Sequence, residues 1–250
     1  MFDAKCIAKI AKMATRFDIE PEALQAIARV ESGGRVFATI NGKKEPLIRF
    51  EGHYFDRLLT GKQRPAARRH KLSHPKAGKI RNPKSQKDRW KLLHQAIAMN
   101  RVAALSSTSW GLGQVMGAHW KWLGYGSVDA LVAEARKGAD GQVSLMARYI
   151  DKAGLIPAIR AGDWKTFAHG YNGPAYARYG YDVRIKQAYE ELTRGKRSSS
   201  KVVSTSRREP ESPSEKSSGS GSLNNILTAA ETRIRKAIRA GLLFISRRFD

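Results

Sequence analysis

Apolar residues recur at helical spacing through most of the first 195 residues, which predicts a mainly α-helical domain. In residues 3–16, Ile7, Ile10 and Ala14 lie on one face of such a helix, and lysines occupy the other face. The same periodicity predicts further helices over 19–32, 90–105, 127–136, 141–152, 164–168 and 183–192. We therefore expect one mainly α-helical domain over residues 1–195.

Two short β-prone runs interrupt this helical pattern near the N-terminus. Phe37–Ile40 and Leu47–Phe50 flank Asn41-Gly42, a dipeptide that favours tight turns, although the connection between the two runs is longer than two residues. The pattern predicts one small β-hairpin, which would bring Glu51 close to Glu31.

The helix over 19–32 carries an unusual acidic residue. It begins at Pro21, whose missing N–H is no loss in a first helical turn, and two glycines follow its end. Glu31 falls on the same face as Leu24 and Ile27, which should point towards the core. A carboxyl group held against apolar side chains can stay protonated near neutral pH and act as a general acid. The competing interpretation is a half-solvated carboxylate at a frayed helix end.

Two glycine-rich stretches downstream could contact a ligand. Ser109–Gly117 contains three glycines beside Trp110 and Gln114, and a tryptophan face with a neighbouring amide suits a sugar ring. A tight packing turn explains the same pattern. The second stretch places Tyr171 and Asn172 before Gly-Pro, so we expect both side chains to be presented from a turn.

Composition narrows the functional classes. The chain of 250 residues has one cysteine, which excludes an intrachain disulfide, and its six histidines lack the spacing of metal ligands, so we expect no metal and no cofactor. No apolar run reaches the roughly 18 to 20 residues that span a bilayer. The N-terminus lacks the apolar region of a signal peptide, so we expect synthesis in the cytoplasm.

The chain is strongly basic, with 46 Lys and Arg against 22 Asp and Glu. Residues 62–91 hold twelve of these cations and one acid, Asp88, together with three prolines. Their first two-thirds are therefore predicted to be an exposed loop. Such a segment is either a solvated insertion or a contact surface for a polyanion.

A change in composition follows the helical domain. Residues 196–222 are rich in Ser, Lys, Arg, Pro and Gly, which predicts a disordered linker. Residues 223–250 regain helical periodicity, and their basic face includes Arg233, Arg235, Lys236, Arg239, Arg247 and Arg248. A basic amphipathic helix of this kind binds anionic membrane or lipopolysaccharide. Docking onto the domain or pairing with a second copy are the alternatives.

Four motifs in this order resemble the N-acetylmuramidase family of bacteriophage and prophage endolysins, which are relatives of lysozyme and the lytic transglycosylases. They are Val-Glu-Ser-Gly-Gly at 30–34, Arg-Phe-Glu-Gly-His-Tyr-Phe at 49–55, Ser-Trp-Gly-Leu-Gly-Gln-Val-Met-Gly at 109–117 and Tyr-Asn-Gly-Pro at 171–174. The resemblance covers about residues 5–192. It implies a lysozyme-like fold and cleavage of the β-1,4 bond between N-acetylmuramic acid and N-acetylglucosamine in peptidoglycan.

The resemblance also implies roles for individual residues. Glu31 matches the catalytic glutamate, and Glu51 matches a second acidic position that acts as a base, an electrostatic stabiliser or a structural partner. His53 could orient Glu51, with a structural histidine as the alternative. The substrate-binding residues implied are Ser32, His53, Trp110, Gln114, Tyr171 and Asn172.

The sequence departs from the family at two places. Gly113 replaces a phenylalanine common before the glutamine, which could loosen a sugar subsite, and the basic segment 62–91 exceeds the usual loop. We expect a monomeric peptidoglycan hydrolase that acts in the periplasm. A lytic transglycosylase is the close alternative. A cationic nucleic-acid-binding or membrane-binding protein is the alternative from another class, although no specific nucleic-acid motif is present.

Overall fold

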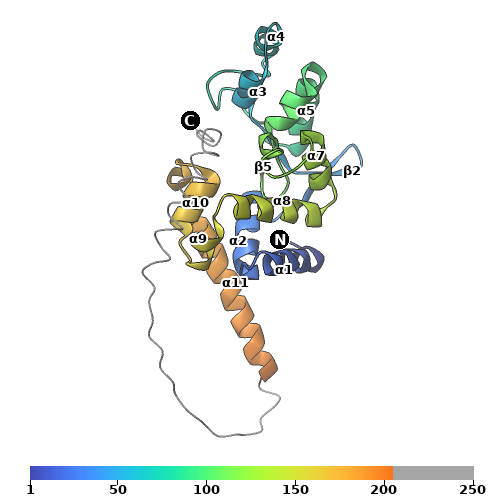
Figure 1. Ribbon diagram of the computed structural model, residues 1–250. Helices are drawn as coiled ribbons and strands as arrows, with labels where there is room; N and C mark the ends of the chain where they lie inside the picture. The colour runs from blue at the N-terminus through green and yellow to red at the C-terminus, as the bar shows by residue number, and fades with distance from the viewer. Residues whose placement is uncertain (205–250) are drawn as a thin grey trace.

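The computed structural model describes residues 1–204 and is mainly α-helical, as predicted, with two small antiparallel sheets (Figure 1). The helices are α1 (Ala4–Arg16), α2 (Pro21–Ser32), α3 (Gly52–Leu58), α4 (Gln63–Arg69), α5 (Gln86–Met99), α6 (Arg101–Ser106), α7 (Val128–Arg136), α8 (Ala139–Lys152), α9 (Ile156–Arg160), α10 (Trp164–Asn172) and α11 (Tyr181–Ser204), with short 3-10 turns η1 (Gly117–His119) and η2 (Tyr176–Tyr179). The strands are β1 (Phe37–Ile40), β2 (Lys43–Pro46), β3 (Ile48–Phe50), β4 (Thr108–Trp110) and β5 (Val115–Met116).

Several helix ends follow directly from local chemistry. The Ser127 hydroxyl accepts a hydrogen bond from the backbone N–H of Ala130 and caps α7, and the Asn100 side chain accepts from Ala103 N–H and caps α6. Gly33 ends α2 in the left-handed conformation, with φ 62°, where a Cβ would be strained. The predicted ends of α1 and α7 are therefore confirmed to within one residue.

The β-hairpin forms, but its second strand differs from the prediction. Phe37–Ile40 pairs with Lys43–Pro46, and Ile40 lies opposite Lys43 across a two-residue Asn41-Gly42 turn. Both turn residues have positive φ, as a tight hairpin turn requires. The expected partner, Ile48–Phe50, instead pairs with β4, because the apolar strand is buried in a second sheet while the lysines of β2 can face solvent.

The second sheet has the order β3-β4-β5, and the basic segment completes its open edge. The Asn82 side chain accepts from the N–H and donates to the carbonyl of Phe50, at 2.9 and 2.7 Å. The Gln86 side chain does the same for Ile48, at 2.9 and 3.2 Å. Two amide side chains thus replace a neighbouring strand. The exposed loop was predicted only for the first two-thirds of the segment, and it is wrong there for Gln63–Arg69, which form α4.

A buried carboxylate fastens the start of the same segment. Asp56 of α3 accepts two hydrogen bonds from Arg68 of α4, both 2.7 Å, and one from the Ser73 hydroxyl at 2.9 Å. Arg64 also donates to the backbone carbonyl of Asp56 at 2.8 Å. The hydrogen bonds from Arg68 lower the pKa of Asp56 below its ordinary value.

We expect the Asp56→Asn variant to be less stable than the wild type by on the order of 1 to 3 kcal/mol, the range for disturbing buried hydrogen-bond partners. Because folding lowers the pKa of Asp56, its stabilisation is full above the unfolded pKa of about 4 and declines as the pH falls through the lower folded value. Urea unfolding of both proteins between pH 7 and pH 3 measures this. A stability difference that does not change with pH would contradict it.

The helices divide into two groups around the sheets (Figure 1). α3, α4 and α5 occupy the upper end in that view, and α1, α2 and α8 to α11 occupy the lower part. α2 packs against both α1 and α11 and buries Leu24 and Ile27. The end of α2 that carries Glu31 is therefore held by two helices that are distant from one another in the sequence.

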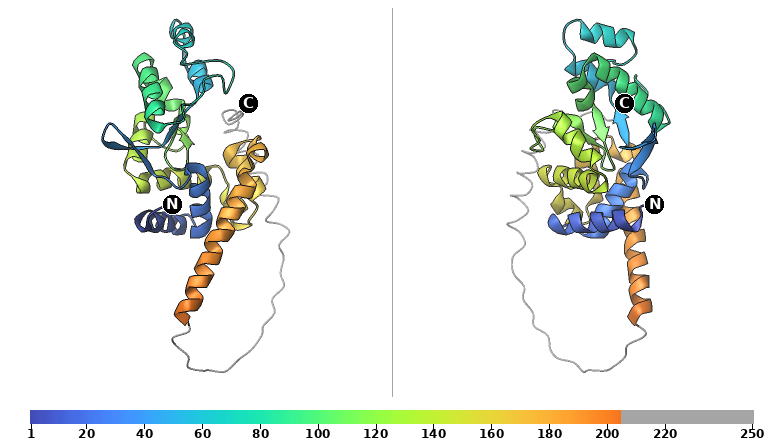
Figure 2. Two further views of the ribbon diagram at one scale, coloured as in Figure 1. Left: turned by 180° about the vertical axis from the view of Figure 1, so that it is seen from behind. Right: turned by 90° about the vertical axis from the view of Figure 1, so that its right-hand side faces the viewer.

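The C-terminal helix is longer than predicted. α11 continues to Ser204 and projects beyond the rest of the fold (Figure 2), so the expected domain boundary at residue 195 lies inside a helix. The remaining parts of the predicted linker 196–222 and helix 223–250 lie outside the described residues. Up to residue 204, the structure has no helix with the length and apolar content needed to cross a bilayer.

Candidate active site

Glu31 lies in the last turn of α2, where the chain turns sharply at two glycines with positive φ. The Ser32 hydroxyl donates to the carbonyl of Ala28 at 2.7 Å and accepts from Gly34 N–H at 3.1 Å. Ser32 is buried and these contacts shape the helix end, while its expected substrate-binding role stays a prediction. Glu31 itself is half-buried.

Asn172 connects α10 to the Glu31 carboxylate. Its Nδ2 donates to Glu31 Oε1 at 2.6 Å, and the residue is 1% exposed. Within the described residues, its Oδ1 atom is buried without a hydrogen-bond partner. Tyr171 and Asn172 end α10 rather than standing in a turn, so that expectation is corrected: the helix continues to the glycine that follows.

Tyr171 fixes the position of this helix end. Its hydroxyl donates to the carbonyl of Gly113 at 2.6 Å, and its ring stacks on Phe167 and meets Tyr149 edge-on. A Cβ on Gly113 would lie 2.6 Å from Met146 Cβ and 3.1 Å from the Tyr171 hydroxyl. Gly113 thus permits close packing here, which is the physical reason for a glycine at this position.

Glu51 follows β3 and is buried between two basic side chains. Arg49 Nε donates to Glu51 Oε1 at 2.8 Å, and His53 Nδ1 lies 3.6 Å from Glu51 Oε2. His53 is 2% exposed, with its ring centroid 4.6 Å from that of Tyr54. A positive partner on one oxygen stabilises an ionised carboxylate. The Arg49 guanidinium therefore favours the ionised form of Glu51 and fixes its orientation, which suits a base or an electrostatic stabiliser.

Hydrogen bonds connect the sequence motifs of Glu51 and Gly113. Phe50 pairs with Thr108 across β3 and β4, and Glu51 N–H donates to the carbonyl of Ser107 at 2.8 Å. Gln114 Nε2 donates to the carbonyls of Gly111 and Leu47, at 2.8 and 3.3 Å.

Tyr171 reaches Gly113, Asn172 reaches Glu31, and Arg49 lies opposite Ser109 across β3 and β4, so contacts join all four motifs.

Trp110 does not offer a sugar-binding face. The residue is 1% exposed, its indole N–H donates to the carbonyl of Leu105 at 3.1 Å, and its ring meets Trp90 edge-on. The expectation of a stacking platform at Trp110 is corrected to a core position, because both ring faces are covered by protein. Gln114 remains partly exposed.

Three further residues shape the site and were not identified from the sequence. Arg49 holds Glu51, and Asn82 holds the backbone of Phe50. Gln142 of α8 is buried and accepts from Leu112 N–H at 2.9 Å, which supports the glycine-rich turn. Gln142 stands among the apolar positions of α8, and this was the only feature of the local sequence that could have indicated its supporting role. In residues 1–204, His, Cys, Asp and Glu do not gather in groups of three that could hold a metal.

Removal of the Asn172 amide should reduce activity. We expect Asn172→Ala to lower kcat about 10- to 100-fold, since a hydrogen bond to a charged group contributes about 1.5 to 3 kcal/mol. Steady-state release of soluble glycan from peptidoglycan measures this. Gln187→Ala, which removes an exposed amide from α11, should retain full activity. Equal rates for both variants would show that the Asn172 contact is dispensable.

The geometry agrees with comparisons to known proteins. A family model described as N-acetylmuramidase matches residues 20–193. The crystal structure of an endolysin from the Burkholderia phage AP3 matches with a TM-score of 0.64 and 32% sequence identity, over 75% of this chain and 71% of that one. Comparison with curated proteins finds no match. The family match spans all four motifs, from the residue before α2 to the middle of α11.

Proposed function

Because the chain belongs to the N-acetylmuramidase family, and is thus a peptidoglycan hydrolase of the lysozyme type, we propose that it cleaves the β-1,4 bond between N-acetylmuramic acid and N-acetylglucosamine. The observation that supports this most directly is the placement of Glu31. Its carboxyl group lies in the last turn of α2 and is oriented by Asn172, whose neighbour Tyr171 donates to the carbonyl of Gly113. A glycosidase needs one such positioned acid.

In the proposed mechanism, Glu31 protonates the glycosidic oxygen as the bond to the muramic acid breaks. The Asn172 amide holds Oε1 of Glu31 and so fixes the orientation of the carboxyl group that carries the transferred proton. Positive charge then develops on the muramic acid ring. A water molecule attacks the ring and completes hydrolysis, and Glu51 contributes the second carboxylate as base or electrostatic stabiliser.

The close alternative is lytic transglycosylation. There the 6-hydroxyl of the muramic acid takes the place of water, and the product carries a 1,6-anhydro ring. Both reactions need the same acid, so Glu31 and Asn172 serve either one.

Product analysis tests the function and separates the two reactions. Purified peptidoglycan is digested with the full chain, and the released muropeptides are weighed by mass spectrometry. We expect reducing muramic acid ends. Products lighter by the mass of one water would establish transglycosylation instead. A folded protein that releases no muropeptides would overturn the enzymatic proposal.

We also propose that the protein acts on periplasmic peptidoglycan as a monomer, and that residues 223–250 bind anionic membrane or lipopolysaccharide. The six cations predicted for that contact lie outside the described residues. A variant that ends near Arg194 should cleave purified peptidoglycan normally and lose part of its vesicle binding. Unchanged vesicle binding would contradict the role of the tail.

A further inference from the structure

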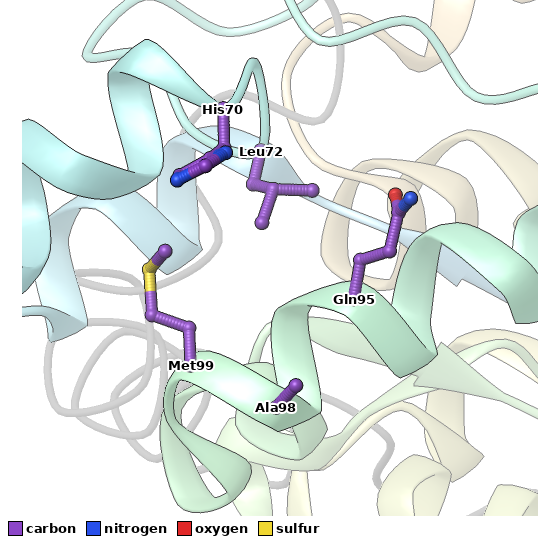
Figure 3. Close-up of a pocket in the computed structure, with 5 residues that line it drawn as sticks. All are labelled: His70, Leu72, Gln95, Ala98 and Met99. Atoms are coloured by element: carbon purple, nitrogen blue, oxygen red, sulfur yellow. The ribbon is translucent and has the colours of Figure 1, made fainter.

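A pocket lies at the upper end of the molecule, lined by none of the motif residues. It has a volume of about 400 Å³ and is lined by His70, Leu72, Gln95, Ala98 and Met99. Figure 3 shows these side chains facing one another across the pocket, two from the segment after α4 and three from α5. Leu72, Ala98 and Met99 make much of its lining apolar, and its volume is in the range of ligand sites.

Residues 62–91, which form one wall of the pocket, are rich in cations without ion-pair partners. Of its twelve Lys and Arg, three have internal roles: Arg68 binds Asp56, Arg64 donates to backbone carbonyls, and Arg89 donates to Pro83 and Ile48 carbonyls. The other nine are exposed and form no ion pair with the residues that the structure describes. Asp88, the one acid between 62 and 91, is hydrogen-bonded to Ser85.

Two of these cations neighbour lining residues of the pocket, one along the chain and one along α5. Lys71 stands between the lining residues His70 and Leu72. Lys91 precedes Gln95 by one helical turn, so it shares a face of α5 with the lining residues. Both lysines are exposed. The result is a partly apolar pocket with positive charge at its rim.

We propose that this pocket and its cationic rim bind an anionic phospholipid, with the phosphate headgroup at Lys71 and Lys91 and apolar chain atoms against Leu72 and Met99. Charge complementarity supports the placement of the headgroup, since basic residues near an anionic bilayer each strengthen binding. The apolar side chains of Leu72 and Met99 support the placement of the lipid chain atoms. A nucleic acid would use the cations and leave this wall uncovered, because no Phe, Tyr or Trp lines it for base stacking.

The pocket and its cationic rim would hold the catalytic domain at a membrane independently of residues 223–250. It lies on the segment whose Asn82 and Gln86 side chains complete β3. The fold therefore needs those amides for structure, while the nine cations are available for a partner.

The first test measures binding of the full chain to vesicles. We expect the double variant Lys71→Glu and Lys91→Glu to bind vesicles of phosphatidylglycerol and phosphatidylcholine at least ten-fold more weakly than the wild type. Lys152→Glu with Lys165→Glu changes the net charge equally at exposed positions of α8 and α10, and should have a smaller effect. Equal loss in both double variants would show that only net charge matters, which would overturn the proposal.

The second test measures the environment of a dye attached to a residue that lines the pocket. An environment-sensitive dye is attached through Ala98→Cys, and the control is Ala161→Cys at the end of α9. Cys6 should label slowly, because burial raises the pKa of its thiol to about 11. We expect the dye at position 98 to shift to an apolar emission with phosphatidylglycerol vesicles and not with phosphatidylcholine alone, and the dye at position 161 to remain unchanged.

Two outcomes would overturn the lipid assignment. One is vesicle binding with no change in the dye at position 98, which would place the contact elsewhere. The other is the same change with duplex DNA at equal phosphate concentration, which would make the surface a general polyanion site. Peptidoglycan cleavage by each variant is measured in parallel, so loss of lipid binding is distinguished from loss of the enzyme.

Discussion

Replacement of Glu31 by glutamine should abolish peptidoglycan cleavage and leave the fold intact. The glutamine side chain has the same size, and its oxygen can still accept the hydrogen bond from Asn172. It cannot donate a proton to the leaving sugar oxygen. Loss of a general acid lowers a rate by about 10²- to 10⁴-fold, so we expect kcat to fall by about 10³-fold or more. Muropeptide release at saturating substrate measures the change.

The matched control lies on the same helix. Glu22 forms an ion pair with Lys196 at 2.7 Å, so Glu22→Gln removes one carboxylate from α2 away from the motifs. It should retain activity within about two-fold, because Glu22 contacts none of the motif residues and pairs with Lys196. Thermal unfolding of both variants verifies that they are folded. A folded Glu31→Gln variant with wild-type activity would remove Glu31 from the mechanism.

Replacement of Glu51 by glutamine should lower kcat about 10²- to 10³-fold, with a smaller change in KM. The charge would disappear between Arg49 and His53, and with it either the activation of water or the stabilisation of the positive sugar ring. Both are effects on the transition state, so kcat should carry most of the loss. Initial rates over a range of peptidoglycan concentrations separate the two constants.

Glu45 provides the comparison for a purely structural effect. Its carboxylate pairs with Arg136 at 2.9 Å and its side chain is 18% exposed, but it lies in β2 outside the motifs. Glu45→Gln should cost some stability and little kcat. If Glu51→Gln has the same small effect on kcat and a similar loss of stability, Glu51 is a structural partner of Arg49.

The longer helices could be predicted from the sequence because their signals are local, whereas the short helices α3, α4 and α9 were not predicted. Apolar periodicity and capping residues lie within one helix, as Ser127 and Val128 show for α7. The length of α10 was underestimated because Gly170 breaks the pattern, although the helix continues through it. Its Cβ position is occupied by Leu155, so packing explains the glycine.

The pairing of the strands was harder to predict because partner strands can be distant in the sequence. The turn at Asn41-Gly42 was predicted, but the choice between Lys43–Pro46 and Ile48–Phe50 as second strand depended on β4, which follows about sixty residues later. Trp110 was misassigned for the same reason. Its pattern of neighbouring glycines fits a sugar platform or a packed turn, and only the contact with Trp90 decides between them.

The sequence by itself determined the helical class, the acid on the inner face of α2 and the family motifs, because each depends on residues close together in the chain. Only the tertiary structure decided that Asn172 orients Glu31, that Tyr171 reaches Gly113, and that a basic segment completes a sheet. These contacts join residues in different elements, up to 141 positions apart. Local propensity carries no information on such pairs, since long-range packing selects them.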